Sequence, residues 1–356
     1  MTTKKLVSIV IPAYNAEEFI EDSIKSCFSQ TYRPIEIIIV NDGSTDSTVP
    51  VVNDLYHSIS NGGIESRIID IGENRGAANA LNVGFSSAQG DYICWLSADD
   101  VFIDKQKVQK QVGFMDKTKA LWSYFRDYYT GTSVSNASLR KSSYLPHLRI
   151  LDSIFVRNSD LRLMLLLFRN PINGSSVMIK KDCIKMYDQF DPITRNVDGD
   201  GDLWMRYSAL KLKLGALEGA SIFYRKHAKQ TSKKKILMIH GSELTRMRIL
   251  LTLEKKGNLV SLIKKFTPYL VFIVMNREHF SRPFVSEFLF SYILANKKEF
   301  NEIFLKYVRK SLNDIKKHVN YLILDEDRFL KDIAAYMESY TFKKFEERFL
   351  YRLDGS

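Results

Sequence analysis

Short apolar runs alternate with segments of helical spacing through the first hundred residues, and this alternation constrains the fold more than any other feature. Four runs have the length and composition of buried strands, and they span residues 6–11, 35–40, 67–71 and 92–96. Three intervening segments are predicted helices. Residues 17–30 place their apolar side chains on one side, residues 45–57 begin with helix-start residues, and residues 76–88 are rich in small residues. Repeated strand–helix–strand units require right-handed crossovers. We therefore predict a Rossmann-like α/β fold whose mostly parallel central sheet has helices on both faces.

The remainder of the chain differs in composition and in the spacing of its apolar residues. Residues 101–235 are less regular, and they include helical spacing at 151–168 and at 203–214. From about residue 236, glycine and proline become scarce, while Lys or Arg alternates with Leu, Ile or Phe at helical spacing. We therefore divide the chain into residues 1–100 and 101–235, as two halves of one α/β domain, and a basic helical region at 236–356.

Composition narrows the environment in which such a chain works. Three cysteines lie far apart in the sequence, which favours a reducing compartment and supplies neither a disulfide framework nor a set of zinc ligands. No apolar run reaches the roughly 18 residues of a membrane span, and no secretory leader is recognisable, so we predict a cytoplasmic protein. The formal charge of +11 suits phosphorylated substrates, an anionic membrane face or nucleic acid, and it does not choose among them.

Polar or turn-forming residues follow each of the four predicted strands. They occupy positions 12–15, 41–44, 72–75 and 97–100. The carboxyl ends of parallel strands meet at one edge of a sheet, and ligands of open α/β sheets bind at that edge. We therefore expect these segments to form one site.

Two of these segments contain acidic residues, and each could have a binding role or a structural one. Asp42 could accept hydrogen bonds from a ribose or a base edge, or it could cap the next helix. Asp99 and Asp100 are adjacent carboxylates that repel each other, and they ionise most easily beside Mg²⁺ or Mn²⁺ bound through substrate phosphates. The alternative is an acidic start to the helix that follows.

Two later segments add candidate groups. Three acids between Asp198 and Asp202 precede the helix predicted at 203–214, where one could act as a general base or all could be solvated caps. Arg225 and His227 follow the strand predicted at 216–224. They could bind phosphate or metal, although a lone histidine is more often structural.

Taken together, these segments resemble the family 2 glycosyltransferases in order and spacing. The strongest matches are residues 7–16 (VSIVIPAYNA), 38–46 (IIVNDGSTD), 73–76 (ENRG) and 90–100 (GDYICWLSADD). Weaker matches at 200–204 (DGDLW) and 224–227 (YRKH) extend the resemblance to about residue 232, and nothing beyond is similar. The resemblance implies a GT-A fold, with the nucleotide-sugar half at 1–100 and the acceptor side at 101–235.

The resemblance also assigns roles to single residues on the donor side. The segment that lines the nucleotide base is matched by Pro12, Ala13 and Tyr14. Asp42 matches the acid that binds the uracil or ribose, and Arg75 lies in a segment that approaches the base.

The diphosphate end of the donor is assigned to a second group. Asp99 matches the last acid of the Asp-x-Asp motif, which holds a divalent metal (Mn²⁺ or Mg²⁺) and the diphosphate. Ser97 replaces the first acid of that motif, and Ala98 is its middle residue. His227 matches a residue that contacts the metal or the diphosphate, and Arg225 would add positive charge there.

Asp200 matches the catalytic acid, with Gly199 in place of the usual preceding glutamate. It would take the proton of an acceptor hydroxyl as that oxygen attacks the anomeric carbon from the face opposite the leaving nucleoside diphosphate. The implied enzyme is an inverting hexosyl- or N-acetylhexosaminyltransferase. Its expected donor is a UDP-sugar, and its expected acceptor is a glycan or a lipid-linked sugar in surface polysaccharide or glycolipid biosynthesis.

The residues also leave other functions open. Ser97 and Gly199 favour a degenerate nucleotide-sugar-binding protein without transfer activity. A nucleotidyltransferase would need a phosphate loop rich in glycine and basic residues after the first strand, and residues 12–15 (PAYN) offer none. A nucleic-acid-binding protein is suggested only by the positive charge, because no nucleic-acid-binding motif is evident. The helices of 236–356 would stabilise the domain, form a homo-oligomer, or make a peripheral contact with the inner face of the membrane.

Overall fold

The computed structural model describes residues 4–58, 63–141, 149–187, 189–275 and 282–319. The chain divides into two compact units. The first unit comprises residues 1–157, 171–203 and 212–230, and the second comprises residues 158–170, 204–211 and 231–356. The boundaries predicted from the sequence at 100 and 235 stay predictions.

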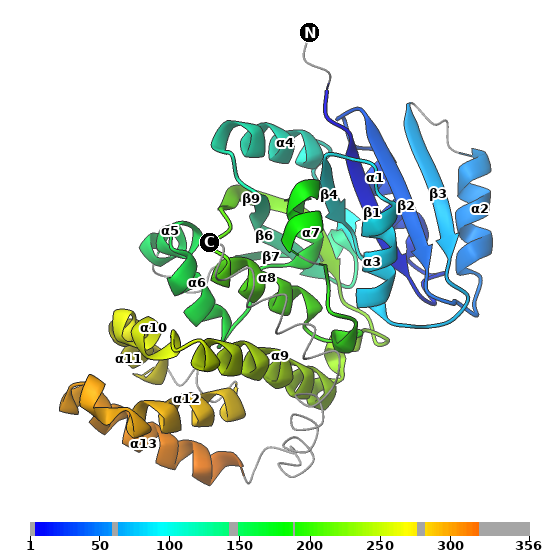
Figure 1. Cartoon of the computed structure of the whole chain (residues 1–356). Coiled ribbons are helices and arrows are strands. Elements are labelled where there is room, and N and C mark those ends of the chain that lie inside the picture. The colour runs from blue at the N-terminus through cyan, green and yellow to red at the C-terminus, as the bar shows by residue number, and fades with distance from the viewer. Residues whose placement is uncertain (1–3, 59–62, 142–148, 188, 276–281, 320–356) are drawn as a thin grey trace. The chain divides into compact units, whose positions relative to one another are not determined.

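The first unit is built around a nine-stranded sheet with the order β3-β2-β1-β4-β8-β6-β9-β5, in which β7 pairs with β6. Its first four strands are parallel neighbours, and they are β1 (Val7–Ala13), β2 (Ile35–Asn41), β3 (Ile64–Asp70) and β4 (Tyr92–Trp95). Figure 1 shows these strands in blue and teal. Most of the paired residues in the sheet belong to parallel ladders, so the predicted mostly parallel α/β sheet is confirmed.

Helices cover both faces of these strands because their side chains alternate. Ile9 and Ile37 face one core with α1 (Ile20–Phe28) and α2 (Thr48–Ser58). Val40 faces the opposite side, where α3 (Ala77–Ser87) packs against β1 and β2. A Cβ on Gly84 would lie only 3.2 Å from a Val40 methyl, which explains why α3 is rich in small residues.

The second half of the sheet mixes strand directions. Antiparallel pairs join β4 to β8, β8 to β6, β6 to β7 and β5 to β9, whereas β6 and β9 are parallel. The strands are β5 (Val101–Phe102), β6 (Trp122–Gly131), β7 (Ser138–Lys141), β8 (Met178–Lys180) and β9 (Leu214–Arg225). The helices are α4 (Lys107–Thr118), α5 (Arg149–Arg157) and α7 (Lys181–Tyr187), with 3-10 turns η1 (Val134–Asn136), η2 (Gly174–Ser176) and η3 (Pro192–Thr194).

Two helix predictions in the middle region are wrong in detail. The single helix predicted at 151–168 is broken into α5 and α6 (Ser159–Leu166) at Asn158, whose side chain caps α6 by accepting a hydrogen bond from the Leu161 N–H. The helix predicted at 203–214 is α8 (Gly199–Ala209), which begins earlier and ends before β9. Its first turn therefore contains Asp200 and Asp202, where carboxylates stabilise the positive end of the helix dipole.

The second unit is helical, as predicted for the C-terminal region. Besides α6 it contains α9 (Lys235–Lys255), α10 (Leu259–Lys265), α11 (Thr267–Met275), α12 (Pro283–Ala295) and α13 (Glu302–Val319), with 3-10 turns η4 (Thr231–Lys233) and η6 (Lys297–Glu299). Buried side chains such as Leu289, Phe290 and Val308 form its core where α12 packs on α9 and α13. In the described parts of the chain, no helix combines the length and the apolar character needed to cross a bilayer. Residues 320–356 of the predicted helical region lie outside the described residues.

Candidate active site

The loops after β1 and β2 are tied together at the carboxyl edge of the parallel strands. The Asp42 N–H donates to the Ala13 carbonyl over 2.8 Å, and the Thr45 N–H donates to Asn15 Oδ1 over 2.8 Å. Pro12 lies opposite Val40 in the β1–β2 register. Tyr14 follows Ala13, and its side chain is 48% exposed. The residues matched to the base-binding segment therefore lie together at this edge, beside Asp42.

Asp42 is buried and organises the start of α3. Its two carboxylate oxygens accept hydrogen bonds from the backbone N–H groups of Arg75 (2.8 Å) and Gly76 (2.9 Å). Gly43 has φ +68°, and a Cβ there would lie 2.7 Å from the Glu73 backbone, so this close approach requires glycine. The structure thus brings Asp42 and Arg75 together, as the resemblance implies, while their contact with a nucleotide stays a prediction.

The turn after β4 holds Asp100 in the interior. Asp100 is 1% exposed, and its Oδ2 accepts a 2.7 Å hydrogen bond from the Ser175 hydroxyl of η2. The Arg225 N–H lies 3.3 Å from Oδ1. Burial, with the neighbouring Asp99 charge, raises the pKa of Asp100 well above its ordinary value. Ser97 is fixed beside it, because its N–H donates to Ser175 Oγ over 3.2 Å.

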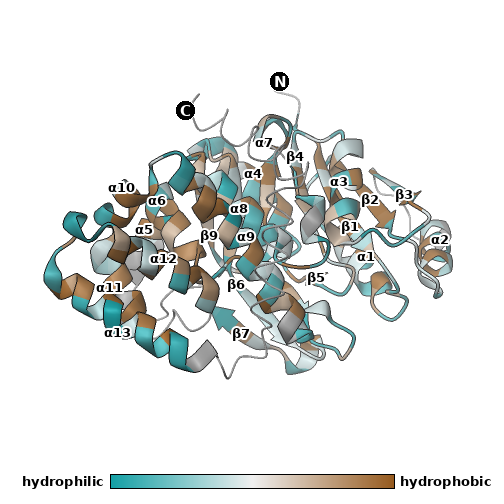
Figure 2. Cartoon of the chain, turned by 60° about the horizontal axis from the view of Figure 1, so that its bottom comes forward, coloured by the Kyte–Doolittle hydropathy of each residue, from teal (hydrophilic) through white to brown (hydrophobic). Residues whose placement is uncertain are grey.

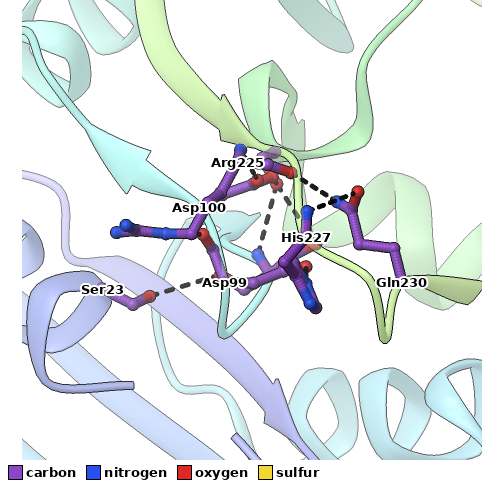
Figure 3. Close-up of polar contacts among 8 residues, drawn as sticks. Ser23, Asp99, Asp100, Arg225, His227 and Gln230 are labelled. Atoms are coloured by element: carbon purple, nitrogen blue, oxygen red, sulfur yellow. Dashed lines mark hydrogen bonds and ion pairs between the residues drawn. The ribbon is translucent and has the colours of Figure 1, made fainter. Parts of the chain in front are cut away.

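Asp99 and His227 converge on one point from β4 and β9. Asp99 Oδ2 and His227 Nε2 are 2.9 Å apart, and the two side chains are 27% and 19% exposed. Figure 3 shows the pair beside Asp100 and Arg225. The Phe19 ring of the segment before α1 lies 4.6 Å from the His227 ring, between centroids, and limits its orientation. A carboxylate and an imidazole thus meet in a partly solvated position.

Arg225 connects this turn to α1. Its Nε donates to the Asp99 carbonyl over 3.0 Å, and its Nη2 forms a 2.8 Å ion pair with Asp22. The guanidinium also lies over the Phe19 ring, 5.1 Å from its centroid. The Gln230 amide donates to the Arg225 carbonyl and accepts from the His227 N–H (Figure 3). These contacts fix the backbone of the acidic turn. Direct contact of Arg225 with a diphosphate stays a prediction.

The donor set fits a divalent ion that is bound largely through its substrate. Among the described residues, no group of three or more His, Cys, Asp or Glu side chains is placed to hold a metal. Asp99 and His227 would offer such an ion one carboxylate oxygen and one imidazole nitrogen at a partly exposed position. Mg²⁺ commonly takes one or two carboxylates from the protein and completes its shell with phosphate oxygens and water.

The segment before Asp200 is anchored to the same edge. The Arg195 carbonyl accepts a 2.8 Å hydrogen bond from the Ala78 N–H at the start of α3, and Asn196 Oδ1 accepts one from the Ala77 N–H. Phe190 packs edge-on against Trp95 of β4, with ring centroids 5.4 Å apart. These contacts tie residues 190–196 to the helix start that Asp42 organises.

The first turn of α8 then presents Asp200. Asp200 is partly exposed and its Oδ1 accepts a 2.8 Å hydrogen bond from the Gly201 N–H, whereas Asp202 is fully buried. A Cβ on Gly199 would meet the Thr194 hydroxyl at 2.9 Å and the Phe190 ring at 3.2 Å. A larger side chain at position 199 would therefore require the Thr194 side chain and the Phe190 ring to shift.

Three residues of this site are not among the predicted site residues. Ser175 supports Asp100, and Phe19 and Asp22 contact His227 and Arg225. Ser175 belongs to a run of small residues, 173–176, which is a recognisable turn signal with no indication of its partner. Phe19 and Asp22 look like ordinary helix residues, because their partners lie about 200 positions away in the sequence.

Comparison with known proteins places this site in a family. The model of the family "Glycosyl transferase family 2" matches residues 8–171. WfaP of Escherichia coli, a UDP-Glc:alpha-D-GlcNAc-diphosphoundecaprenol beta-1,3-glucosyltransferase, is 30% identical over 233 residues, covering 65% of this chain and 81% of WfaP. An uncharacterised glycosyltransferase of Haemophilus influenzae is 40% identical over 31% of this chain, and one of Rickettsia bellii is 31% identical over 67%. These alignments span only 42% and 32% of those two relatives.

Solved structures show the same fold at low sequence identity. Residues 1–349 of TarS from S. aureus, in complex with UDP-GlcNAc, superpose with a TM-score of 0.56 at 14% identity. The superposition covers 88% of this chain and 91% of that one. At such identity the likeness concerns the fold alone. Together, the GT-A-like fold, the four loops at one edge and the identity to WfaP over most of its length show that this chain belongs to glycosyltransferase family 2.

Proposed function

We propose that the protein transfers a hexose or an N-acetylhexosamine from a UDP-sugar to a hydroxyl of a lipid-linked acceptor sugar, with inversion at the anomeric carbon. The observation that carries the proposal is the convergence of Asp99 and His227 at the edge that also holds Asp42. The donor and the acceptor are proposed by analogy with WfaP, which is named for glucosyl transfer from UDP-Glc to a GlcNAc-diphosphoundecaprenol. Assembly of a surface polysaccharide or glycolipid is the pathway that this acceptor suggests.

Asp200 is the proposed general base. It is partly exposed in the first turn of α8, whereas the nearby Asp202 is buried. Its carboxylate takes the acceptor proton while the acceptor oxygen bonds to the anomeric carbon and the bond to UDP breaks. Because this is a single displacement, attack comes from the face opposite UDP, and an α-linked donor gives a β-linkage. A positioned base of this kind contributes about 10²- to 10⁴-fold to the rate.

Asp99 and His227 are the residues that would hold a divalent ion against the diphosphate. When bound there, such an ion supplies positive charge that stabilises the leaving UDP. The protein's own contribution is to fix the Asp99 carboxylate, through the Arg225 contact to its carbonyl and through buried Asp100. Pro12, Ala13, Tyr14, Asp42 and Arg75 are the proposed nucleotide-binding residues.

The acceptor's lipid suggests that the protein works against the inner face of the cytoplasmic membrane, and α13 offers a suitable surface. Phe304 and Val308 are buried in the core of the second unit, while Ile303 and Tyr307, on the adjacent face of the helix, are 73% and 39% exposed. Exposed Lys and Arg side chains surround them, and α13 shows alternating teal and brown bands in Figure 2. Exposed apolar side chains among basic ones are typical of helices that lie on anionic lipid. A homo-oligomer stays a prediction.

A donor screen tests the function directly. Purified protein is incubated with a panel of UDP- and GDP-sugars and with a GlcNAc-diphospho-lipid that carries a short, soluble chain, with and without Mn²⁺. We expect acceptor-dependent release of UDP that requires the metal. Binding of a UDP-sugar without any release of UDP would instead favour the degenerate nucleotide-sugar-binding protein, the alternative that Ser97 keeps open.

A further inference from the structure

We infer that the hairpin formed by β6 and β7 binds the sugar ring of the acceptor, with Tyr129 as the residue on which that ring stacks. The inference rests on the proposed function and adds to it the surface that receives the acceptor. It is carried by three observations: an exposed apolar pair on the hairpin, the register that places Tyr129 opposite Phe223, four positions before His227, and the absence of another occupant among the described residues.

The hairpin exposes apolar side chains that a sheet would ordinarily cover. Tyr129 is 37% exposed, and Leu139, directly opposite it in the antiparallel β6–β7 register, is 47% exposed. Val134 in the connecting turn is 56% exposed. Within the described ranges, the Tyr129 ring makes no aromatic contact and its hydroxyl makes no hydrogen bond. Tyr129 and Leu139 thus form a small apolar platform.

The strand register connects this platform to the site. Tyr129 pairs with Phe223 and Gly131 pairs with Arg225 across the parallel β6–β9 ladder, and the Lys226 N–H donates to the Gly131 carbonyl over 2.7 Å. Residues that pair across a ladder point to the same face, and neighbouring strands are about 4.8 Å apart. Tyr129 therefore shares its face with Phe223 and Arg225, the residues that lead directly into His227.

The chemistry of the platform suits a sugar ring. One face of a pyranose carries C–H groups and is apolar, while its hydroxyls point outward and stay solvated. An aromatic ring offers a flat surface with a negative face to such C–H groups and loses little conformational freedom on binding. The other exposed tyrosine near the site, Tyr14, follows β1 beside Asp42 on the proposed nucleotide side. Two exposed tyrosines would therefore serve two substrates.

Single substitutions separate these roles. Tyr129→Ala should raise the KM for the GlcNAc-diphospho-lipid probe by about tenfold, the value of one good aromatic contact. The KM for the UDP-sugar and the rate of donor hydrolysis should stay unchanged. Tyr129→Phe should leave the acceptor KM at its wild-type value, because stacking uses the ring and not the hydroxyl. Met186→Ala, which removes a 57% exposed apolar side chain from α7, is the matched surface control and should change neither KM.

The same variants are also titrated with the probe in the presence of UDP, without turnover. Weaker binding by Tyr129→Ala than by wild type and Tyr129→Phe supports the inference. Equal binding by wild type and Tyr129→Ala overturns it and leaves the proposed function standing. Failure of the wild type to bind the probe while it still hydrolyses its donor overturns the inference together with the proposed lipid-linked acceptor. A wild-type protein that binds no UDP-sugar would instead overturn the proposed function. A rise in donor KM equal to the rise in acceptor KM would identify a general structural effect and also overturn the inference.

Discussion

Replacing Ser175 with alanine tests whether the acidic turn depends on its buried support. The Ser175 hydroxyl donates the shorter of the two hydrogen bonds that Asp100 accepts, 2.7 Å against 3.3 Å from the Arg225 N–H. Both Ser175 and Asp100 are at most 2% exposed, so water cannot simply replace the lost donor. Asp100 precedes β5 directly and follows Asp99, and any shift of its carboxylate moves the proposed metal ligand.

The expected cost follows from this burial. Removing one partner of a buried polar group costs about 1–3 kcal/mol of unfolding free energy. The displaced Asp99 should lower kcat/KM for the donor by about 10- to 100-fold, because small misplacements of a reacting constellation have effects of that size. Loss of the Ser175 donor should also raise the pKa of Asp100 further, since a hydrogen bond to a carboxylate favours its charged form.

Ser176→Ala is the matched control within the same 3-10 turn. Its hydroxyl is equally buried and donates a 2.7 Å hydrogen bond to the Asn173 carbonyl, with no contact to Asp100. Urea unfolding and metal-dependent UDP release are measured for both variants. We expect both to lose stability and only Ser175→Ala to lose donor turnover and Mn²⁺ affinity. Equal effects of the two substitutions on turnover would refute the idea that Ser175 acts through Asp100.

Three further predictions address other parts of the chain. Asp200→Asn should lower turnover about 10²- to 10⁴-fold with donor binding intact, and near-normal turnover of Asp200→Asn together with inactive Asp202→Asn would show that the base is assigned to the wrong acid. The double variant Ile303→Ser, Tyr307→Ser removes two exposed apolar side chains from α13 and should float less with phosphatidylglycerol vesicles than the wild type does. Unchanged flotation would exclude α13 as the lipid contact. Burial raises the pKa of Glu243 from 4.5 to about 7, so the folded state binds this proton more tightly than the unfolded chain does. The unfolding free energy should therefore fall by up to about 3 kcal/mol as the pH rises from 4.5 to about 7. Glu243→Gln should reduce this pH dependence of the unfolding free energy, measured by urea unfolding at pH 5 and 8.

The parts of the fold that the sequence predicts are those whose signal is local. β1 and β2 are fully or almost fully buried apolar runs, so their periodicity needs no knowledge of the partner strand. β6 is not predicted, because Arg126 and Asp127 interrupt its apolar pattern at a point where the register with β9 shifts. The start of α8 is misplaced because Gly199 and Gly201 look like loop residues, whereas both lie in the first turn of the helix.

The candidate site divides in the same way. The four loops at the sheet edge follow from strand direction alone, and the parallel ladders of β1 to β4 confirm their common edge. The meeting of Asp99 with His227 was suggested by resemblance and cannot be derived from spacing, because the two residues are 128 positions apart. The roles of Phe19 and Asp22 cannot be predicted from the sequence, since aromatic and acidic residues are common in any amphipathic helix.

These long-range pairs bear on which piece of the chain can be active. The segment with the strongest family resemblance, about residues 1–110, contains Asp42 and Asp99 but neither of the side chains that fix the acidic turn from η2 and β9, Ser175 and Arg225. Ser175 reaches Asp100 across 75 positions, and Arg225 reaches Asp22 across 203. Closing such long loops costs entropy that only the completed sheet offsets. The arrangement of Asp99, Asp100, Arg225 and His227 is therefore a property of the whole first unit, and it forms only when β9 pairs with β5 and β6.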